Sequence, residues 1–105
     1  MNTNRDVEIL KLIIKHCDEV KYGIEKYDLD FEKFVDDPII KNGISMAIMQ
    51  IGENSKRLSK ELKKKYSQLP WVLIGDMRNR FAHAYDFMNE DVIWEVAEDY
   101  VGATL

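Results

Sequence analysis

Apolar residues recur at three- and four-residue steps along almost the whole of this chain, and this periodicity restricts the fold more than any other feature. Residues spaced in this way share one face of an α-helix, because the helix turns by about 100° per residue. No segment alternates between apolar and polar residues for long enough to require a β-strand. The sequence therefore predicts an all-α, up-down bundle of four main helices, or five with one short helix.

The spacing predicts a first helix from about Asp6 to Gly23, with Thr3 or Asn4 as its N-terminal cap and Gly23 as its left-handed end. A short helical turn follows at Phe31 to Val35. The predicted apolar face of the first helix consists of Val7, Leu10, Ile13 or Ile14, Cys17, Val20 and Ile24.

A second long helix begins at Pro38, with Asp36 or Asp37 as its cap. Its apolar stripe extends over roughly 24 residues, with a polar interruption at Asn54 and Ser55. The stripe consists of Ile40, Ile44, Ala47, Ile51, Leu58 and Leu62.

Two further helices are predicted after a polar connection. Pro70 opens the first, capped by Ser67 or by local backbone, with Trp71, Ile74, Met77 and Phe81 as its apolar face. Asn89 caps the second, which ends at about Val101. The inward residues of this last helix are Val92, Ile93, Val96 and Tyr100.

Composition limits the class of protein. A hydrophobic fraction of 46% and a charged fraction of 32% over 105 residues are typical of one soluble globular domain, residues 1–105. We expect no membrane span, because no run of about 18 apolar residues occurs. We expect no signal segment, because the first residues lead straight into an amphipathic pattern. The lone Cys17 cannot form an internal disulfide, so we expect a cytoplasmic protein. His16 and Cys17 point about 100° apart on a helix, so we expect no metal and no cofactor.

The net charge is −4, with a pI of about 5.1. Proteins that hold long nucleic acid by their overall charge are usually basic, so this balance argues against that mode of binding. A local site for one or two phosphates remains compatible with it.

The segment Met77 to Phe87, MRNRFAHAYDF, concentrates two arginines, a tyrosine and one of only two histidines. Arg78 and Tyr85, seven residues apart, share one helix face. Arg78 and His83, five residues apart, lie about 140° from each other around an ideal helix. These two side chains meet at one substrate only if the helix ends or distorts near His83, or if a second subunit completes the site. The spacing therefore favours a dimer.

These residue types suit cleavage of an RNA phosphodiester. Histidine exchanges protons near neutral pH, and arginine carries a fixed charge that matches phosphate oxygens. Tyrosine adds a hydroxyl group and an aromatic face for a base. The alternative is an ordinary polar helix edge, with solvated arginines and His83 bonded to a carbonyl. Spacing alone does not separate the two interpretations.

Arg78-x4-His83-x-Tyr85 resembles the Arg-x(4–6)-His motif of the HEPN superfamily. More closely, the chain is similar to the HepT-like proteins, toxins paired with a minimal nucleotidyltransferase antitoxin. Two segments carry this resemblance beyond the motif: AIMQIGENSKRLS, residues 47–59, and LPWVLIGDMRNRFAHAYDF, residues 69–87. VIWEVAEDY suits the family's last helix. Family members commonly carry glycine between the histidine and the tyrosine, whereas this chain has Ala84.

The resemblance implies a HEPN helical bundle that forms a symmetric homodimer, with the paired motifs in an interface cleft. Arg78 and His83 would be the residues of a metal-independent ribonuclease, and Asn79 matches the polar residue after the arginine. Tyr85 would be adenylylated by the nucleotidyltransferase, placing bulk and negative charge where RNA binds. The expected partners are RNA, this antitoxin and a second copy of the chain, with a larger heteromeric complex as an alternative to the homodimer; neither DNA nor a membrane is expected.

Two neighbouring features have alternative interpretations. By resemblance Glu53 lies near the cleft, where it would orient Arg78 or His83; otherwise it forms a surface pair with Arg57. The run Lys56 to Lys65, KRLSKELKKK, either guides RNA toward the cleft or is a solvated helix end. Trp71 and Trp94 are interpreted as core or dimer contacts.

A different class of function also fits the sequence. In a non-catalytic HEPN module associated with a minimal nucleotidyltransferase, Arg78 and Tyr85 would hold an AMP group or a partner's nucleotide, and His83 would only donate or accept a hydrogen bond. A purely structural dimer is a third interpretation.

Overall fold

The computed structural model describes residues 3–67, 71–86 and 89–98. Within these ranges the chain forms helices and no strand, so the predicted all-α bundle is confirmed. The helices are α1 (Thr3–Lys26), α2 (Phe31–Asp36), α3 (Pro38–Arg57), α4 (Lys60–Lys65), α5 (Trp71–Asp86) and α6 (Glu90–Glu95). In the described part, no helix is both long enough and apolar enough to cross a membrane.

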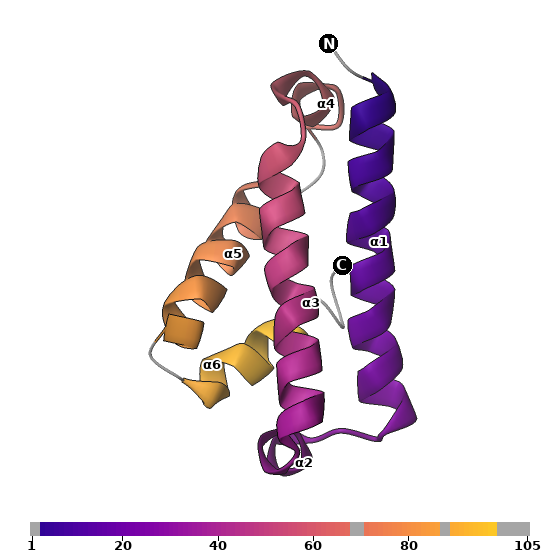
Figure 1. The fold of residues 1–105 in the computed structure, drawn as a ribbon. Coiled ribbons are helices and arrows are strands. Elements are labelled where there is room, and N and C mark those ends of the chain that lie inside the picture. Colours follow the sequence, from indigo (N-terminus) through magenta and orange to yellow (C-terminus); the bar gives the residue numbers. More distant parts are fainter. Residues whose placement is uncertain (1–2, 68–70, 87–88, 99–105) are drawn as a thin grey trace.

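The central element is α3, which packs against α1 on one side and α5 on the other (Figure 1). Because α1 and α5 both run antiparallel to α3, the three long helices form the body of the bundle. The short helices α2 and α4 lie across its two ends, and α6 folds back from the end of α5 toward α3. The two faces of α3 therefore hold the bundle together.

The core lies between α3 and its neighbours α1 and α5, and buried residues of α2 and α6 belong to it. Predicted core residues from each long helix are buried, and Trp94 packs against Phe34 with ring centroids 5.2 Å apart. On α1, however, Val7 is 42% exposed, and Ile13 packs on the core while Ile14 is exposed. The side chain of Ile74 and all of Tyr100 lie outside the described part. Buried core residues include Cys17, Val20, Ile44, Ala47, Ile51, Met77, Phe81, Ile93 and Val96.

Two predicted N-terminal caps are confirmed. The Asp37 carboxylate accepts hydrogen bonds from the backbone N–H groups of Ile39 and Ile40 at 3.0 and 3.2 Å, directly before Pro38. The side chain of Asn89 accepts from the backbone N–H of Val92 at 3.4 Å. The α6 helix gives way to a π turn at residues 96–98, and its predicted end at Val101 lies outside the described residues, as does Pro70.

The predicted limits of the first helix are wrong at both ends. Thr3 and Asn4 lie inside α1 instead of capping it, and the helix continues past Gly23 to Lys26. The left-handed residue is Asp28, with a φ of 47°. The N–H of the next residue bonds to the carbonyl of Ile24, which closes the helix with Leu29 buried. Aspartate tolerates this conformation, so glycine was not required.

The predicted long helix is divided in two. Leu58 is extended, and the Ser59 hydroxyl caps α4 by accepting from the N–H of Leu62 at 3.1 Å. The Asp6 carboxylate, only 4% exposed, accepts from the backbone N–H of Ser59 at 3.0 Å and from its hydroxyl at 2.6 Å. These bonds lower the pKa of Asp6 below its ordinary value. A contact from α1 therefore fixes the break after Arg57.

Candidate functional site

Arg78 lies at a close approach between α3 and α5. A Cβ atom added to Gly52 of α3 would lie 2.6 Å from Arg78 Cγ and 3.2 Å from Arg78 Cβ. Real side chains do not pack this closely, so only glycine at position 52 leaves room for the aliphatic stem of Arg78. Position 52 is the glycine of Ile-Gly-Glu within AIMQIGENSKRLS, residues 47–59, one of the segments that carry the family resemblance.

Two hollows follow one another along the α3–α5 groove, and Arg78 lines both. The first, of about 60 Å³, we call the basic hollow; it is lined by Ser55, Lys56, Lys63, Trp71 and Arg78, with Gly52 and Gly75. The second, of about 150 Å³, we call the Tyr85 hollow; its lining includes Met49, Glu53, Arg78, Phe81, Tyr85 and Asp86. Arg78 is in the lining of both hollows and therefore lies at the boundary between the basic hollow and the Tyr85 hollow.

The Tyr85 hollow brings together three predicted site residues, Glu53, Arg78 and Tyr85. Arg78 and Tyr85 both line it, as expected for residues on one face of a helix. Tyr85 is 40% exposed and its ring stacks on Phe81, with centroids 5.7 Å apart. Arg78 Nη2 donates a hydrogen bond to Asn79 Oδ1, so the predicted Asn79 contacts the guanidinium directly. The side chains of Tyr85 and Arg78 thus line the same space.

His83 lies elsewhere on the same helix. It is exposed in the last turn of α5, and it is not among the described residues that line either hollow. Residues 71–86 form one continuous α-helix, which extends three residues beyond His83. The helix therefore neither ends nor distorts at His83. The explanation that an end or a distortion of the helix brings Arg78 and His83 together is wrong. Completion by a second subunit is the alternative that remains.

Glu53 lines the Tyr85 hollow and forms an ion pair with Lys56 at 3.9 Å. Arg57 instead donates to Asn54 Oδ1 at 2.9 Å, so the predicted surface pair between Glu53 and Arg57 is wrong. Both members of the observed pair are more than half exposed, and such pairs contribute little stability. The Glu53 carboxylate is therefore only weakly held, and it lies at the edge of the groove.

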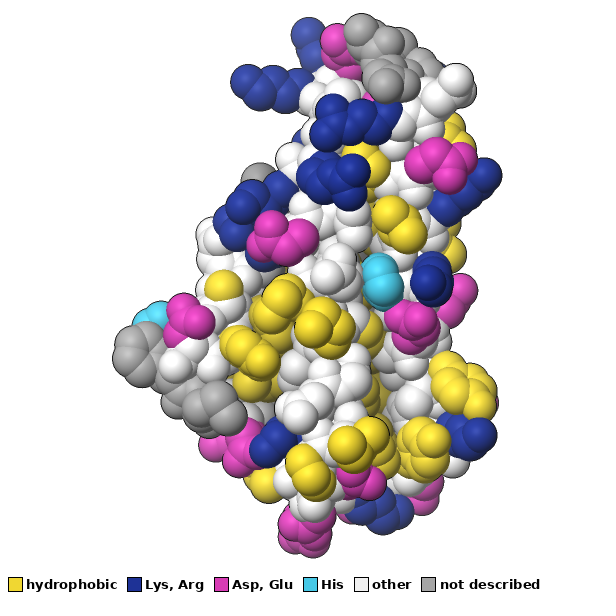
Figure 2. Space-filling view, viewed as in Figure 1, with side chains coloured by type: hydrophobic (Ala, Val, Ile, Leu, Met, Phe, Trp, Pro, Cys, Tyr) yellow, Lys and Arg dark blue, Asp and Glu magenta, His cyan; other side chains and the backbone are white. Residues whose placement is uncertain are grey.

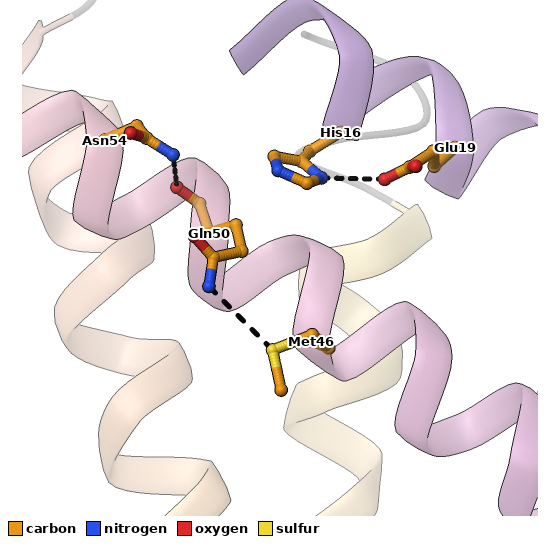
Figure 3. A network of polar contacts seen from close by, with 5 residues as sticks. All are labelled: His16, Glu19, Met46, Gln50 and Asn54. Atoms are coloured by element: carbon orange, nitrogen blue, oxygen red, sulfur yellow. Dashed lines mark hydrogen bonds and ion pairs between the residues drawn. The ribbon is translucent and has the colours of Figure 1, made fainter. Parts of the chain in front are cut away.

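The other histidine has a structural contact on α1. His16 Nδ1 lies 2.7 Å from Glu19 Oε1, beside a row of polar contacts along α3 that includes Asn54 and Gln50 (Figure 3). Cys17 is buried in the core, and burial raises the pKa of its thiol. Across the described ranges, no group of three or more His, Cys, Asp or Glu side chains is arranged to hold a metal ion.

The surface of α3 between its neighbours is apolar at one end and basic at the other. Figure 2 shows hydrophobic side chains gathered over α3 and beside it, and Lys and Arg side chains gathered toward the α4 end. Ile39 and Met46 on α3 are 79% and 54% exposed, and Ile14 and Tyr22 on α1 are 59% and 60% exposed. This surface lies on the same helix that carries Gly52 and Glu53.

An all-α bundle with an Arg-x4-His-x-Tyr motif on a continuous helix, set against a glycine of the central helix, defines a HEPN-like class of protein. Residues 8–103 match the family model described as "Ribonuclease HepT-like". The chain therefore belongs to this family.

Curated relatives carry ribonuclease names. The chain is 36% identical over 87 residues to a "Putative RNase" of Caldanaerobacter subterraneus subsp. tengcongensis, covering 82% of this chain and 75% of the relative. It is 30% identical over 71 residues to a "Putative RNase" of Methanocaldococcus jannaschii, covering 68% of this chain and 61% of the relative. It is 28% identical over 72 residues to the "Probable ribonuclease HepT" of Thermococcus cleftensis, covering 69% and 66%. No solved structure gave a significant match.

Proposed function

We propose that this chain is a metal-independent RNA endonuclease and the toxin of a HEPN–nucleotidyltransferase pair, with Arg78 and His83 as its catalytic residues. The observation that carries this proposal is the position of Arg78. Its stem rests on Gly52, and its guanidinium is bonded to Asn79 at the boundary of two hollows. The ribonuclease names of the relatives support the same activity.

The chemistry requires no group beyond the chain and its substrate. The 2′-hydroxyl of RNA attacks the adjacent phosphorus, and the bond to the 5′-oxygen of the next nucleotide breaks. His83 removes the proton from the attacking hydroxyl or supplies one to the leaving oxygen. Arg78 stabilises the negative charge that develops on the phosphate oxygens.

A homodimer completes the site in this proposal. Arg78 and His83 point in different directions from one continuous helix, so a single chain does not direct both at one phosphate. In a symmetric dimer, His83 of one protomer faces Arg78 of its partner across a shared cleft. The exposed Ile39 and Met46 on α3 give this contact an apolar surface.

Tyr85 is the proposed site of control. The partner nucleotidyltransferase transfers AMP from ATP to the Tyr85 hydroxyl, which loses its proton as pyrophosphate leaves. Tyr85 is 40% exposed and shares its hollow with Arg78. The added phosphate lies beside the guanidinium, where it neutralises the charge that RNA needs and occupies the space. Adenylylation therefore silences the toxin.

Cleavage of labelled RNA in excess EDTA tests the activity. Arg78→Ala and His83→Ala should each lower the rate by about 10²- to 10⁴-fold, the usual range for loss of a charge-stabilising or proton-transferring group. Matched controls are Arg80→Ala, whose guanidinium pairs with Glu95 at 3.0 Å, and His16→Ala on α1. Both controls should cleave like the wild type.

Two results would contradict the proposal. Cleavage that survives in His83→Ala with folding intact removes His83 from the mechanism. An unmodified wild type that does not cleave RNA supports instead the non-catalytic module, in which Arg78 and Tyr85 hold a nucleotide.

A further inference from the structure

The basic hollow is separate from the residues proposed for catalysis except at Arg78. Lys56 comes from the last turns of α3, Lys63 from α4 and Trp71 from the first turn of α5. Three cationic side chains thus converge from three helices on one space of about 60 Å³. Such convergence differs from a row of charges on one solvated helix face.

The break after Arg57 places Lys63 in this position. The α4 helix lies across the end of α3 (Figure 1). Its Lys63 lines the hollow, with the ammonium 5.9 Å from the centre of the Trp71 ring. The indole Nε1 of Trp71 donates to the carbonyl of Tyr66 at 3.0 Å, which fixes the ring. Lys60 and Lys64 of the same helix are exposed and do not line the hollow. Among the lysines of α4, Lys63 is therefore the one that lines the hollow.

We propose that the basic hollow binds a backbone phosphate of single-stranded RNA next to the phosphate that is cleaved. This inference rests on the proposed ribonuclease function, because it places the scissile phosphate at Arg78. Lys56 and Lys63 hold the neighbouring phosphate, and Trp71 forms the apolar wall of the subsite. RNA then lies along the α3–α5 groove, with the basic hollow flanking the cleavage site.

Size and charge both favour a phosphate as the occupant. A space of about 60 Å³ accommodates only a few waters, so it suits a phosphate group better than a nucleoside. Lysine ammonium groups bind phosphate as point charges without a required orientation. The Tyr85 hollow, by contrast, also has the carboxylates of Glu53 and Asp86 in its lining, so it is less basic than the basic hollow. The groove therefore has one basic end, although the net charge is −4.

Binding without cleavage tests the subsite directly. In a His83→Ala background, fluorescence anisotropy measures the affinity for a short labelled single-stranded RNA of mixed sequence over a series of NaCl concentrations. Lys63→Gln should weaken binding roughly three- to tenfold and reduce the salt slope by about 0.7, the value for one lost phosphate contact. Lys64→Gln removes the same charge from the same helix and should change neither quantity.

A double comparison strengthens the test. The pair Lys56→Gln with Lys63→Gln should lose about two phosphate contacts in the salt slope, whereas Lys60→Gln with Lys64→Gln should retain the parental slope. All four positions are at least partly exposed, so circular dichroism and thermal melting should show intact folding in each variant.

The outcomes separate the subsite from the activity. Equal losses of RNA affinity in the two double variants would mean that the overall positive charge near α4 attracts RNA. This result would overturn the proposed subsite. Unchanged binding in the Lys56 and Lys63 variants, tested with RNA that wild type cleaves, overturns it as well. If wild type does not cleave RNA but the contrast between Lys63 and Lys64 holds, the ribonuclease proposal fails and the RNA-binding site stands.

Discussion

At the scale of single residues, Gly52 determines how Arg78 is held. The guanidinium receives its direction from a stem packed on the bare backbone of α3, and from its bond to Asn79. Positioning of this kind matters because a displacement of about 1 Å at a reacting group can cost about 10²-fold in rate. We therefore propose that Gly52 is a positioning residue for Arg78.

Gly52→Ala should lower RNA cleavage by about 10- to 100-fold, because the new methyl group displaces Arg78. Gly23→Ala on α1 is the control, since a Cβ there meets only Ile44 Cδ1 at 4.0 Å, an ordinary contact. This control should keep full activity and gain about 0.5–1 kcal/mol in the free energy of unfolding, from higher helix propensity. Cleavage assays and denaturant unfolding measure the two effects. Equal behaviour of the two variants would show that Arg78 tolerates the methyl group.

Residue-scale features were predictable from the sequence where they depend on helix periodicity alone. The shared face of Arg78 and Tyr85 follows from their spacing, and Asp37 and Asn89 are the residues that cap α3 and α6. The role of Gly52 was not predictable, because it depends on which helix packs against it. The family resemblance marked the Ile-Gly-Glu segment without giving this reason.

At the scale of helices, the division between α3 and α4 determines which lysines line the basic hollow. Leu58 and Leu62 continue the apolar stripe at helical spacing, so the local pattern favours an unbroken helix. The contact that breaks it joins Asp6 and Ser59, 53 residues apart in the sequence. The buried face of α1 begins with Asp6 and continues with Ile9, whereas Val7 is exposed. Because the pattern treated the first buried residue as apolar, Val7 was wrongly assigned to the core.

Asp6→Asn should lower the melting temperature at pH 7, because the amide presents a donor where Ser59 also donates. The folded pKa of Asp6 lies below its ordinary 3.8, so the carboxylate stabilises the fold at pH values above about 4. That contribution is lost as the pH falls through the lowered pKa. The melting temperatures of wild type and Asp6→Asn should therefore converge in strong acid.

Thermal denaturation over a series of pH values measures this effect, with Asp36→Asn as a control at an exposed carboxylate of α2. The control should differ little from wild type at any pH. A gap between wild type and Asp6→Asn that is constant from pH 7 to strong acid would contradict the role of the ionised carboxylate.

At the scale of the whole molecule, the regularity of α5 is the main constraint on function. The angle between Arg78 and His83 was available from their spacing, and it already favoured a dimer. The structure removes the competing explanation, because α5 continues to Asp86 without interruption. The sequence alone could not decide whether the helix continues past His83, since Ala84, Tyr85 and Asp86 are compatible with a continuing helix and with a helix end. A second copy of the chain is thus the simplest means of joining the two side chains.

Mixed dimers of Arg78→Ala and His83→Ala test this arrangement. If Arg78 of one protomer acts with His83 of its partner, each mixed dimer contains one site with both mutations and one intact site. Equal mixing after unfolding and refolding should make about half of the dimers mixed, and thus restore about a quarter of wild-type cleavage. The same mixture prepared from Arg78→Ala and a double Arg78→Ala, His83→Ala chain has no intact site and should stay inactive. If the first mixture also stays inactive although mixed dimers form, the two residues do not act across the dimer.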